Sequence, residues 1–206
     1  MPNIQLFDAK GNRKYLTPSE RERFEKAALA ADGLTGTFCL MLLYSGCRIS
    51  EALNLQLHHI DYETKTVLFE TLKQRSKGHY RQVPLPDSFM NLLNQVFDLR
   101  KRQERTREKN QSIWITIWKG KNKPWTRKTA YSRVMKVMEA AGLDGISATP
   151  KGLRHGFAIA CLDKGVPLNM LQKWMGHSSI TTTAIYANAT GEEERSIAQR
   201  LWSTKA

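Results

Sequence analysis

The sequence predicts a mainly α-helical fold with a small antiparallel β-sheet. Two observations lead to this fold class. Most of the chain consists of amphipathic or buried segments that begin at N-cap residues and end at glycines, as helices do. The hydrophobic period becomes strand-like only over residues 60–85 and 112–118. With 206 residues and 41% hydrophobic content, the chain is long enough to bury a real core.

Capping signals predict two helices near the N-terminus. Residues 1–15 are expected to be a lead-in segment. The run TPSE at 17–20 supplies an N-cap, a proline at the first helical position and a capping-box glutamate, so we expect a helix over 18–31. A second helix is expected to start at Thr35 or Thr37. Its apolar residues point in nearly all directions, which predicts a central place in the core.

The run CRISEALNL is expected to form a short helix that precedes the strands. It places Arg48 and Glu51 three residues apart on one face, either as an ordinary surface pair or as part of a site. Residues 60–85 then indicate two or three short strands. Between them, residues 71–79 form a basic hairpin tip, which is either a solvated loop or a finger that reaches into a nucleic-acid groove.

The middle of the chain alternates between helix and strand. We expect a helix over 87–96, and the densely charged residues 99–110 are either its extension or a loop, with a solvated face in both cases. Residues 112–118 alternate like a strand, and residues 119–124 are expected as a basic turn. An amphipathic helix over 126–141 follows.

Reactive side chains gather in the last third of the chain. Thr149 caps a helix in which Lys151, Arg154 and His155 lie at i, i+3 and i+4, so we expect them to project from one face. The next helix ends at Gly176, directly before His177. A helix over 181–186 then carries Tyr186, and residues 191–202 are expected to form an exposed amphipathic helix.

The charge of the chain favours a polyanionic partner. There are 32 Lys and Arg against 19 Asp and Glu, a formal net charge of +13, and the basic residues recur along the whole chain. Nucleic acid is therefore the leading partner class, and a membrane is not expected.

Three cysteines without metal-ligand spacing predict reduced core residues, and no signal peptide opens the sequence, so a cytoplasmic location is expected.

The polar groups in the last third match the chemistry of attack on a phosphodiester. Cations pair with phosphate, imidazoles move protons, and a phenol can act as the nucleophile. With an arginine and a lysine from the first half, the ordered set comprises Arg48, Lys73, Lys151, Arg154, His155, His177 and Tyr186.

In this order and spacing the sequence resembles the tyrosine recombinase (phage integrase) family. The resemblance rests on three motifs: CRISEAL around Arg48, KGLRHG around Arg154, and MGH followed by TTTAIY, which ends at Tyr186. It implies the catalytic-domain fold of that family over residues 16–206, and a prokaryotic, DNA-associated enzyme of a phage or mobile element.

The resemblance also implies a role for each residue. Tyr186 would attack the scissile phosphate and form a 3′-phosphotyrosyl bond, while Arg48 and Arg154 would hold the non-bridging oxygens. His155 would assist removal of the phenol proton, and His177 would donate a hydrogen bond to the phosphate. The acid that protonates the 5′-hydroxyl would be Lys73, with Lys77 as the alternative. Glu51 would orient the cations, and neither a cofactor nor a metal would be needed.

One position departs from the family pattern, and further expectations concern partners. Lys151 stands where many relatives carry a histidine, so the position keeps a positive charge but lacks an imidazole.

The partner implied is double-stranded DNA, on which the chain would assemble as a homo-oligomer, a tetramer. Assembly would use the C-terminal helix and its residues Ile197, Leu201 and Trp202. Further DNA contacts are expected from five basic residues: Lys77, Lys121, Lys123, Arg127 and Lys128.

Other functions remain open at this stage. A catalytically inactive DNA-binding regulator would keep the fold, and a type IB topoisomerase would share the chemistry but not the assembly. Relatives commonly carry an additional N-terminal helical domain that clamps DNA, so the chain is expected to be either a stand-alone catalytic domain or part of a longer protein.

Overall fold

Helix α2 (Gly33–Ser45) is the centre about which the other helices pack. The computed structural model describes residues 6–71, 78–104, 110–188, 195 and 198–199. Nearly every residue of α2 is buried, as its apolar sequence predicts. The helix begins before Thr35 because the Asp32 side chain caps it, accepting a hydrogen bond from the Thr35 backbone N–H at 2.9 Å.

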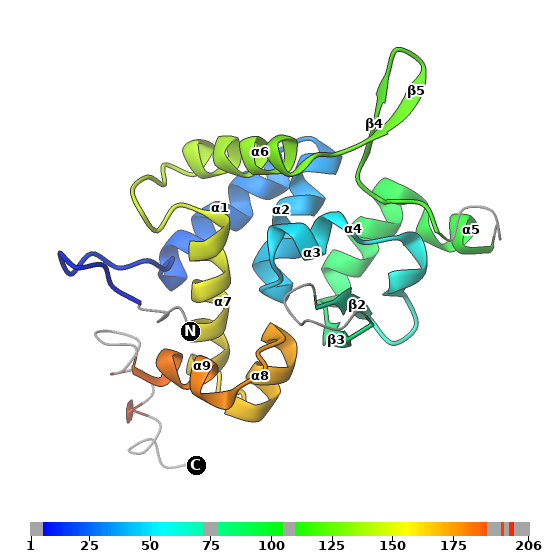
Figure 1. Cartoon of the computed structure of the whole chain (residues 1–206). Helices are drawn as coiled ribbons and strands as arrows, with labels where there is room; N and C mark the ends of the chain where they lie inside the picture. Colours follow the sequence, from blue (N-terminus) through cyan, green and yellow to red (C-terminus); the bar gives the residue numbers. More distant parts are fainter. Residues whose placement is uncertain (1–5, 72–77, 105–109, 189–194, 196–197, 200–206) are drawn as a thin grey trace.

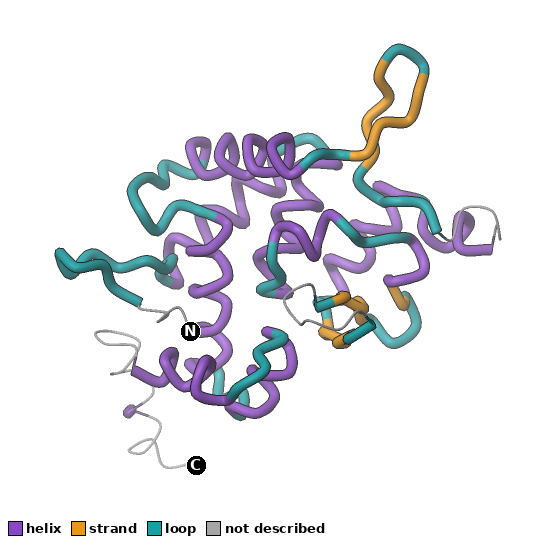
Figure 2. Tube along the Cα trace, viewed as in Figure 1, coloured by secondary structure: helices purple, strands orange, loops and turns teal. Residues whose placement is uncertain are grey.

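The surrounding helices follow the predicted capping signals. Helix α1 (Pro18–Ala30) has the expected capping box between Thr17 and Glu20. Figures 1 and 2 show α1 and α6 along one side of α2, α4 on another, and α7 running down towards α8 and α9. The helices after α2 are α3 (Ile49–Leu53), η1 (Leu57–His59), α4 (Asp87–Phe97), α5 (Leu99–Glu104), α6 (Arg127–Ala140), α7 (Pro150–Asp163), α8 (Leu168–Met175), α9 (Ile180–Ala184) and η2 (Ile185–Asn188).

A three-stranded antiparallel sheet lies beside α3 and α8. Its order is β1 (Ile60–Asp61), β2 (Thr66–Glu70) and β3 (Tyr80–Pro84). In β3 burial alternates, so that Arg81 and Val83 face inward while their neighbours are exposed. The inward face therefore buries an arginine as well as a valine.

A second sheet of two strands, β4 (Ile115–Trp118) and β5 (Lys121–Pro124), projects from the body of the molecule (Figure 1). The prediction of a turn over 119–124 was wrong for its last four residues, because Lys121 pairs with Trp118 and the strand continues to Pro124. Only Lys119 and Gly120 form the turn, and both have positive φ. The backbone hydrogen bonds of the strand pair stabilise a strand that has no buried face.

Two hydrophobic clusters make up the core. In the larger one Phe38 of α2 packs edge-on against Trp114, with ring centroids 4.9 Å apart, and Trp114 Nε1 donates to the Ala52 carbonyl oxygen at 2.6 Å. The smaller one joins α7, α8 and Tyr186 to Leu6 and Tyr15 of the N-terminal segment. The lead-in therefore contributes to the core around Tyr186. Cys39, Cys47 and Cys161 are free thiols.

Within the described residues, no helix combines the length and the apolar character that a bilayer span requires.

Candidate active site

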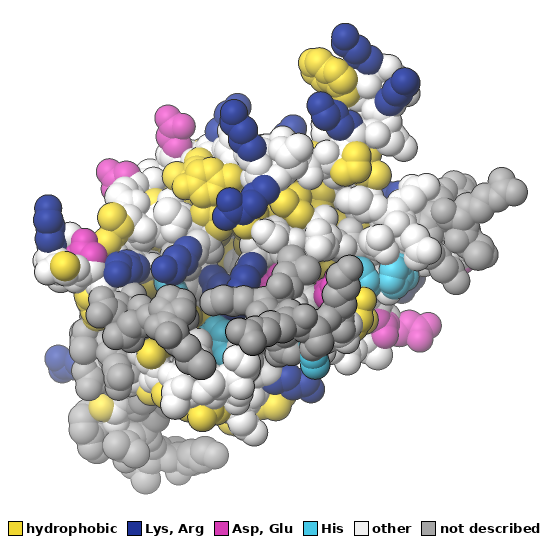
Figure 3. Space-filling model, viewed as in Figure 1, with side chains coloured by type: hydrophobic (Ala, Val, Ile, Leu, Met, Phe, Trp, Pro, Cys, Tyr) yellow, Lys and Arg dark blue, Asp and Glu magenta, His cyan; other side chains and the backbone are white. Residues whose placement is uncertain are grey.

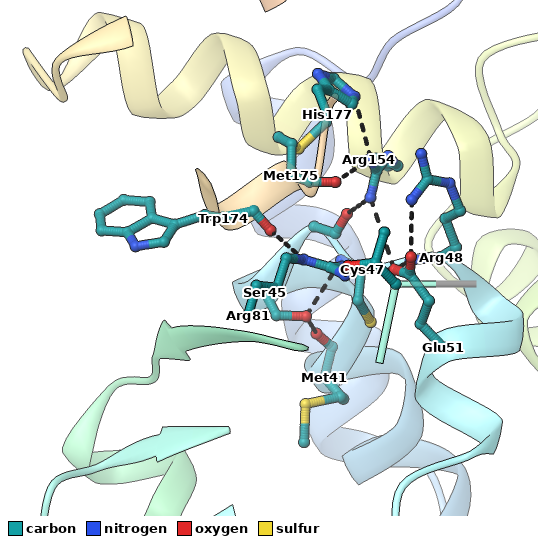
Figure 4. A network of polar contacts seen from close by, with 12 residues as sticks. Met41, Ser45, Cys47, Arg48, Glu51, Arg81, Arg154, Trp174, Met175 and His177 are labelled. Atoms are coloured by element: carbon teal, nitrogen blue, oxygen red, sulfur yellow. Dashed lines mark hydrogen bonds and ion pairs between the residues drawn. The ribbon is translucent and has the colours of Figure 1, made fainter. Parts of the chain in front are cut away.

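Glu51 is a fully buried carboxylate that accepts hydrogen bonds from two arginines. Arg48 Nη1 lies 2.7 Å from Oε1, and Arg81 Nη2 lies 2.5 Å from Oε2 (Figure 4). The Arg48 backbone N–H also donates to Oε2, because Arg48 is the N-cap of α3. Burial raises the pKa of Glu51, but Arg81 and Arg48 outweigh it and hold the pKa below its ordinary value. The carboxylate therefore stays ionised and fixes both guanidinium groups.

Arg154 is a buried cation held by backbone carbonyls from two distant helix ends. Its Nη1 donates to the Gly46 carbonyl oxygen at 2.7 Å, and its Nη2 donates to that of Met175 at 2.6 Å. Gly46 ends α2 in the left-handed conformation, which turns the chain there. Burial lowers the pKa of Arg154 to about 10, so the guanidinium remains charged at neutral pH.

Arg81 completes this cluster, although the sequence pattern alone did not single it out. Its Nε donates to the Trp174 carbonyl oxygen at 2.7 Å and its Nη1 to Thr71 Oγ1 at 3.1 Å, besides the bond to Glu51. One signal could have revealed it. Strand alternation places Arg81 in phase with the apolar Val83, and a charged residue on the inward face of a strand requires a buried partner.

His177 joins the cluster through Arg154. Its Nε2 lies 3.1 Å from Arg154 Nη2, and its Nδ1 lies 2.9 Å from Thr183 Oγ1. A guanidinium has no acceptor, so Nε2 must accept and Nδ1 must carry the proton of the neutral ring. Burial and the charges of Arg154 and Arg48 lower the pKa of His177 to about 3, which favours this neutral form. A hydrogen bond from Nε2 to a phosphate would require the other tautomer or a protonated ring.

Tyr186 lies next to His155 in the smaller hydrophobic cluster. The phenol oxygen is 2.9 Å from His155 Nδ1, and the Tyr186 side chain is almost completely buried. Its ring is nearly parallel to that of His177, with centroids 6.4 Å apart. Burial raises the pKa of the phenol to about 12 despite the nearby Arg154 and Arg48. The phenol is therefore protonated at neutral pH.

His155 is neutral as well. Burial, with Lys151 and Arg154 adding to it, lowers the pKa of His155 to about 4. Its Nδ1 can accept the Tyr186 hydroxyl proton, while its buried Nε2 has no hydrogen-bond partner among the described residues. The ring is thus both close enough and in the right protonation state to act as a base towards the phenol.

The remaining predicted residues lie apart from this cluster or outside the described residues. Lys151 is exposed on the first turn of α7, at positions i, i+3 and i+4 with the buried Arg154 and His155, and its charge helps to lower the pKa of His155 after burial. Lys73 and Lys77 lie outside the described residues. Most of 191–202, including Ile197, Leu201 and Trp202, also lies outside them.

The predicted DNA-contact residues that the structure describes lie on an exposed basic surface. Lys121 and Lys123 are exposed on β5, and Arg127 and Lys128 are exposed at the start of α6. Figure 3 shows Lys and Arg side chains spread over this face of the molecule, from the projecting hairpin across the helices below it.

Comparison with known proteins finds recombinases. The model of the phage integrase family matches residues 14–193. The tyrosine recombinase XerA of Pyrococcus furiosus is 29% identical over 188 residues, which cover 91% of this chain and 61% of that protein. The tyrosine recombinase XerD of Mycobacterium leprae is 33% identical over 177 residues, covering 81% of this chain and 53% of the relative. This chain thus spans about half to three-fifths of the length of these relatives.

Solved structures share the fold. The crystal structure of XerA recombinase superposes with a TM-score of 0.74 at 22% identity and covers 93% of this chain and 66% of that chain. A XerH site-specific recombinase, bound to its palindromic difH substrate after cleavage, gives a TM-score of 0.70 at 22% identity, covering 98% of this chain and 57% of that chain. The predicted fold class, mainly α with small antiparallel sheets, is confirmed.

Proposed function

Because the chain belongs to the phage integrase family of tyrosine recombinases, we propose that it is a site-specific recombinase that breaks and rejoins DNA strands through Tyr186. The observation that carries the proposal is the convergence of Arg48 and Arg154 on one buried carboxylate, with His177 bonded to Arg154 and a histidine-paired tyrosine nearby. Together these groups supply cations for a phosphate and a nucleophile with a base.

Arg48 and Arg154 bind the scissile phosphate. Arg154 is held rigidly by carbonyl groups, and the Arg48 side chain is 29% exposed, so it presents donors to solvent while its Nη1 bonds to Glu51. Guanidinium donors fixed before the substrate arrives stabilise the charge that develops on the non-bridging oxygens, with little reorganisation. His177 adds a donor once its Nε2 carries a proton, which the negative phosphate favours.

Tyr186 is the nucleophile and His155 its base. The phenol oxygen attacks phosphorus, a tyrosyl P–O bond forms, the P–O5′ bond breaks, and the phenol proton passes to His155 Nδ1, 2.9 Å away. In the described arrangement the phenol is protonated and buried, so Tyr186 must leave its pocket, at least in part, to reach a phosphate bound to the arginines.

A lysine of the β2–β3 hairpin protonates the departing 5′-oxygen, and we retain Lys73 for this role with Lys77 as the alternative. The phosphotyrosyl ester keeps the energy of the broken phosphodiester. A 5′-hydroxyl from a second strand can therefore attack it, restore the phenol and rejoin DNA without ATP. Lys151, exposed near His155, supplies a further positive charge at this site.

The proposed partner is double-stranded DNA, in accordance with the formal charge of +13 and the exposed lysines of β5. The Tn1549 transposon integrase, in complex with transposon right end DNA, shares the fold of this chain with a TM-score of 0.65 at 21% identity. Assembly on DNA as a tetramer through residues 191–202 is part of the proposal, as is the assignment of residues 16–206 to the catalytic domain.

The test is capture of the covalent intermediate. Purified protein is incubated with nicked duplexes taken from the DNA that adjoins its coding region, and covalent adducts are resolved on denaturing gels. Wild type should form an adduct and Tyr186→Phe should form none, with equal DNA affinity for both. An adduct of equal yield from the variant would refute the assignment, and binding without any adduct from wild type would favour an inactive DNA-binding protein.

A further inference from the structure

Arg81 lies where the elements of the proposed phosphate site meet, but it does not face solvent. Its side chain is 4% exposed. It extends from β3 to Glu51 of α3 and to Trp174 in the last turn of α8 (Figure 4). It also reaches Thr71, directly after β2. Its guanidinium binds three protein groups and has almost no exposed surface, in contrast to the 29% exposed side chain of Arg48, so in this arrangement Arg81 binds protein groups and not DNA.

We propose that Arg81 is a positioning residue for strand cleavage, which keeps Arg154 free for the phosphate and fixes the turn that leads to His177. The inference rests on the proposed function, since it assigns a role within the same site.

Arg81 and Arg154 compete for the same carboxylate oxygen of Glu51. Arg81 Nη2 lies 2.5 Å from Glu51 Oε2, whereas Arg154 Nη1 lies 3.9 Å from it. If Arg81 were absent, Oε2 would lose a strong donor and Arg154 would be the next guanidinium within reach of it. Because a buried carboxylate needs charge-paired partners, Arg154 would be drawn towards Glu51 and away from its place at the Gly46 and Met175 carbonyls.

The end of α8 is held by both arginines. The carbonyl of Trp174 accepts from Arg81 Nε, and the next carbonyl, that of Met175, accepts from Arg154 Nη2. Two arginines thus bind consecutive peptide groups of one turn. Gly176 follows in the left-handed conformation, and a Cβ there would lie 3.0 Å from Arg81 Nη1. This close packing fixes the path of the chain into His177.

A purely stabilising role for Arg81 is the alternative. The two roles predict different behaviour on a substrate that lacks the phosphate charge. If Arg81 positions Arg48 and Arg154, its loss should slow cleavage most on the charged phosphodiester, whose negative charge these arginines offset in the transition state. If it only stabilises the fold, the cleavage rate falls by the same factor on every substrate.

The experiment compares Arg81→Met and Arg81→Lys with a control, Arg21→Met. Arg21 is a half-buried arginine that donates to the Leu43 carbonyl oxygen and has no contact with Glu51. Single-turnover cleavage is measured on a phosphodiester and on the same nicked duplex with an uncharged methylphosphonate at the scissile position. DNA affinity is measured over a range of salt concentrations, and folding is checked by circular dichroism and thermal unfolding.

For Arg81→Met we expect cleavage of the phosphodiester to fall roughly 10- to 100-fold, since small misplacements of catalytic groups have effects of that size. The loss should shrink to a few-fold on the methylphosphonate, and the salt dependence of binding should not change, because Arg81 contacts no phosphate. Arg81→Lys keeps the charge but not the planar fork, so it should recover part of the rate. Arg21→Met should lose the same factor on both substrates.

Equal losses on the two substrates for Arg81→Met would overturn the inference, and so would a wild-type rate. A further readout needs no cleavage. The pKa of His177 is lowered by burial and then by Arg154, whose Nη2 lies 3.1 Å from His177 Nε2. If Arg154 is drawn towards Glu51, NMR titration of the free protein should show that pKa rising in Arg81→Met and not in Arg21→Met. An unchanged His177 would also count against the inference, whereas absence of an adduct from wild type would refute only the proposed function.

Discussion

Acid should destabilise the folded protein through His155, whose imidazole is buried beside Tyr186. The pKa of His155 is about 4 in the folded chain, against about 6.5 when exposed in the unfolded chain. Between these values the unfolded state binds more protons, so stability is lost as the pH falls from 6.5 through about 4. Each pKa unit corresponds to about 1.4 kcal/mol, which gives about 3 kcal/mol in full and about 2 kcal/mol by pH 5.

Urea denaturation at pH 8, 6.5 and 5 measures this loss in wild type and in His155→Gln. Glutamine can still exchange a hydrogen bond with the Tyr186 hydroxyl but does not titrate. The difference in unfolding free energy between the two proteins should therefore narrow by about 2 kcal/mol from pH 8 to pH 5. Tyr186→Phe is the control, because it alters the pair but keeps the imidazole and so the pH slope. Parallel curves for wild type and His155→Gln would show that the buried-imidazole argument is incorrect.

Three other predictions can be checked separately. Replacing both Lys121 and Lys123 of the projecting hairpin with alanine should lower the slope of log affinity against log salt by about 2 if each contacts a phosphate, and an unchanged slope would remove them from the DNA interface. Gly46→Ala should lower the free energy of unfolding, measured by urea denaturation, by roughly 3 kcal/mol, because φ is +60° and the new Cβ would lie 2.2 Å from the Phe157 ring. Gly120→Ala is the control: φ is +72° but the space around it is open, so the loss should be only about 1 kcal/mol. Glu51→Gln should slow cleavage, since the neutral amide cannot hold two guanidinium groups, while DNA affinity measured by anisotropy stays constant or rises; undiminished cleavage would argue against an orienting role.

Most helix boundaries could be predicted from the sequence because caps are local. Thr17 with Glu20, Thr149 with Pro150, and Gly176 each act within a few residues of their own position. The predicted start of α2, Thr35 or Thr37, is too late, because the Asp32 side chain caps the helix and its first residue is Gly33.

Pairing between distant segments was harder to predict. The sequence placed Arg48 and Glu51 on one face, which the structure confirms, but an i, i+3 pair does not reveal that the carboxylate is fully buried. The role of Arg81 depends on a carbonyl 93 residues away, and no local pattern encodes that distance. The polar residues of β5 predict a turn from the sequence alone, and only their pairing with β4 makes them a strand.

Arg154 is bound on one side by Gly46 and on the other by Met175, so one of its carbonyl partners lies 108 residues before it in the chain and the other 21 residues after it. A chain cut between α5 and β4 would put Gly46, Glu51 and Arg81 on one fragment and Arg154 on the other. Neither fragment alone contains both Arg154 and its partners Gly46 and Glu51, so neither could bury that guanidinium as the whole chain does. If cleavage activity returns when the two fragments are mixed, the fold has reassembled around Arg154. Cleavage can therefore be used to follow fragment complementation.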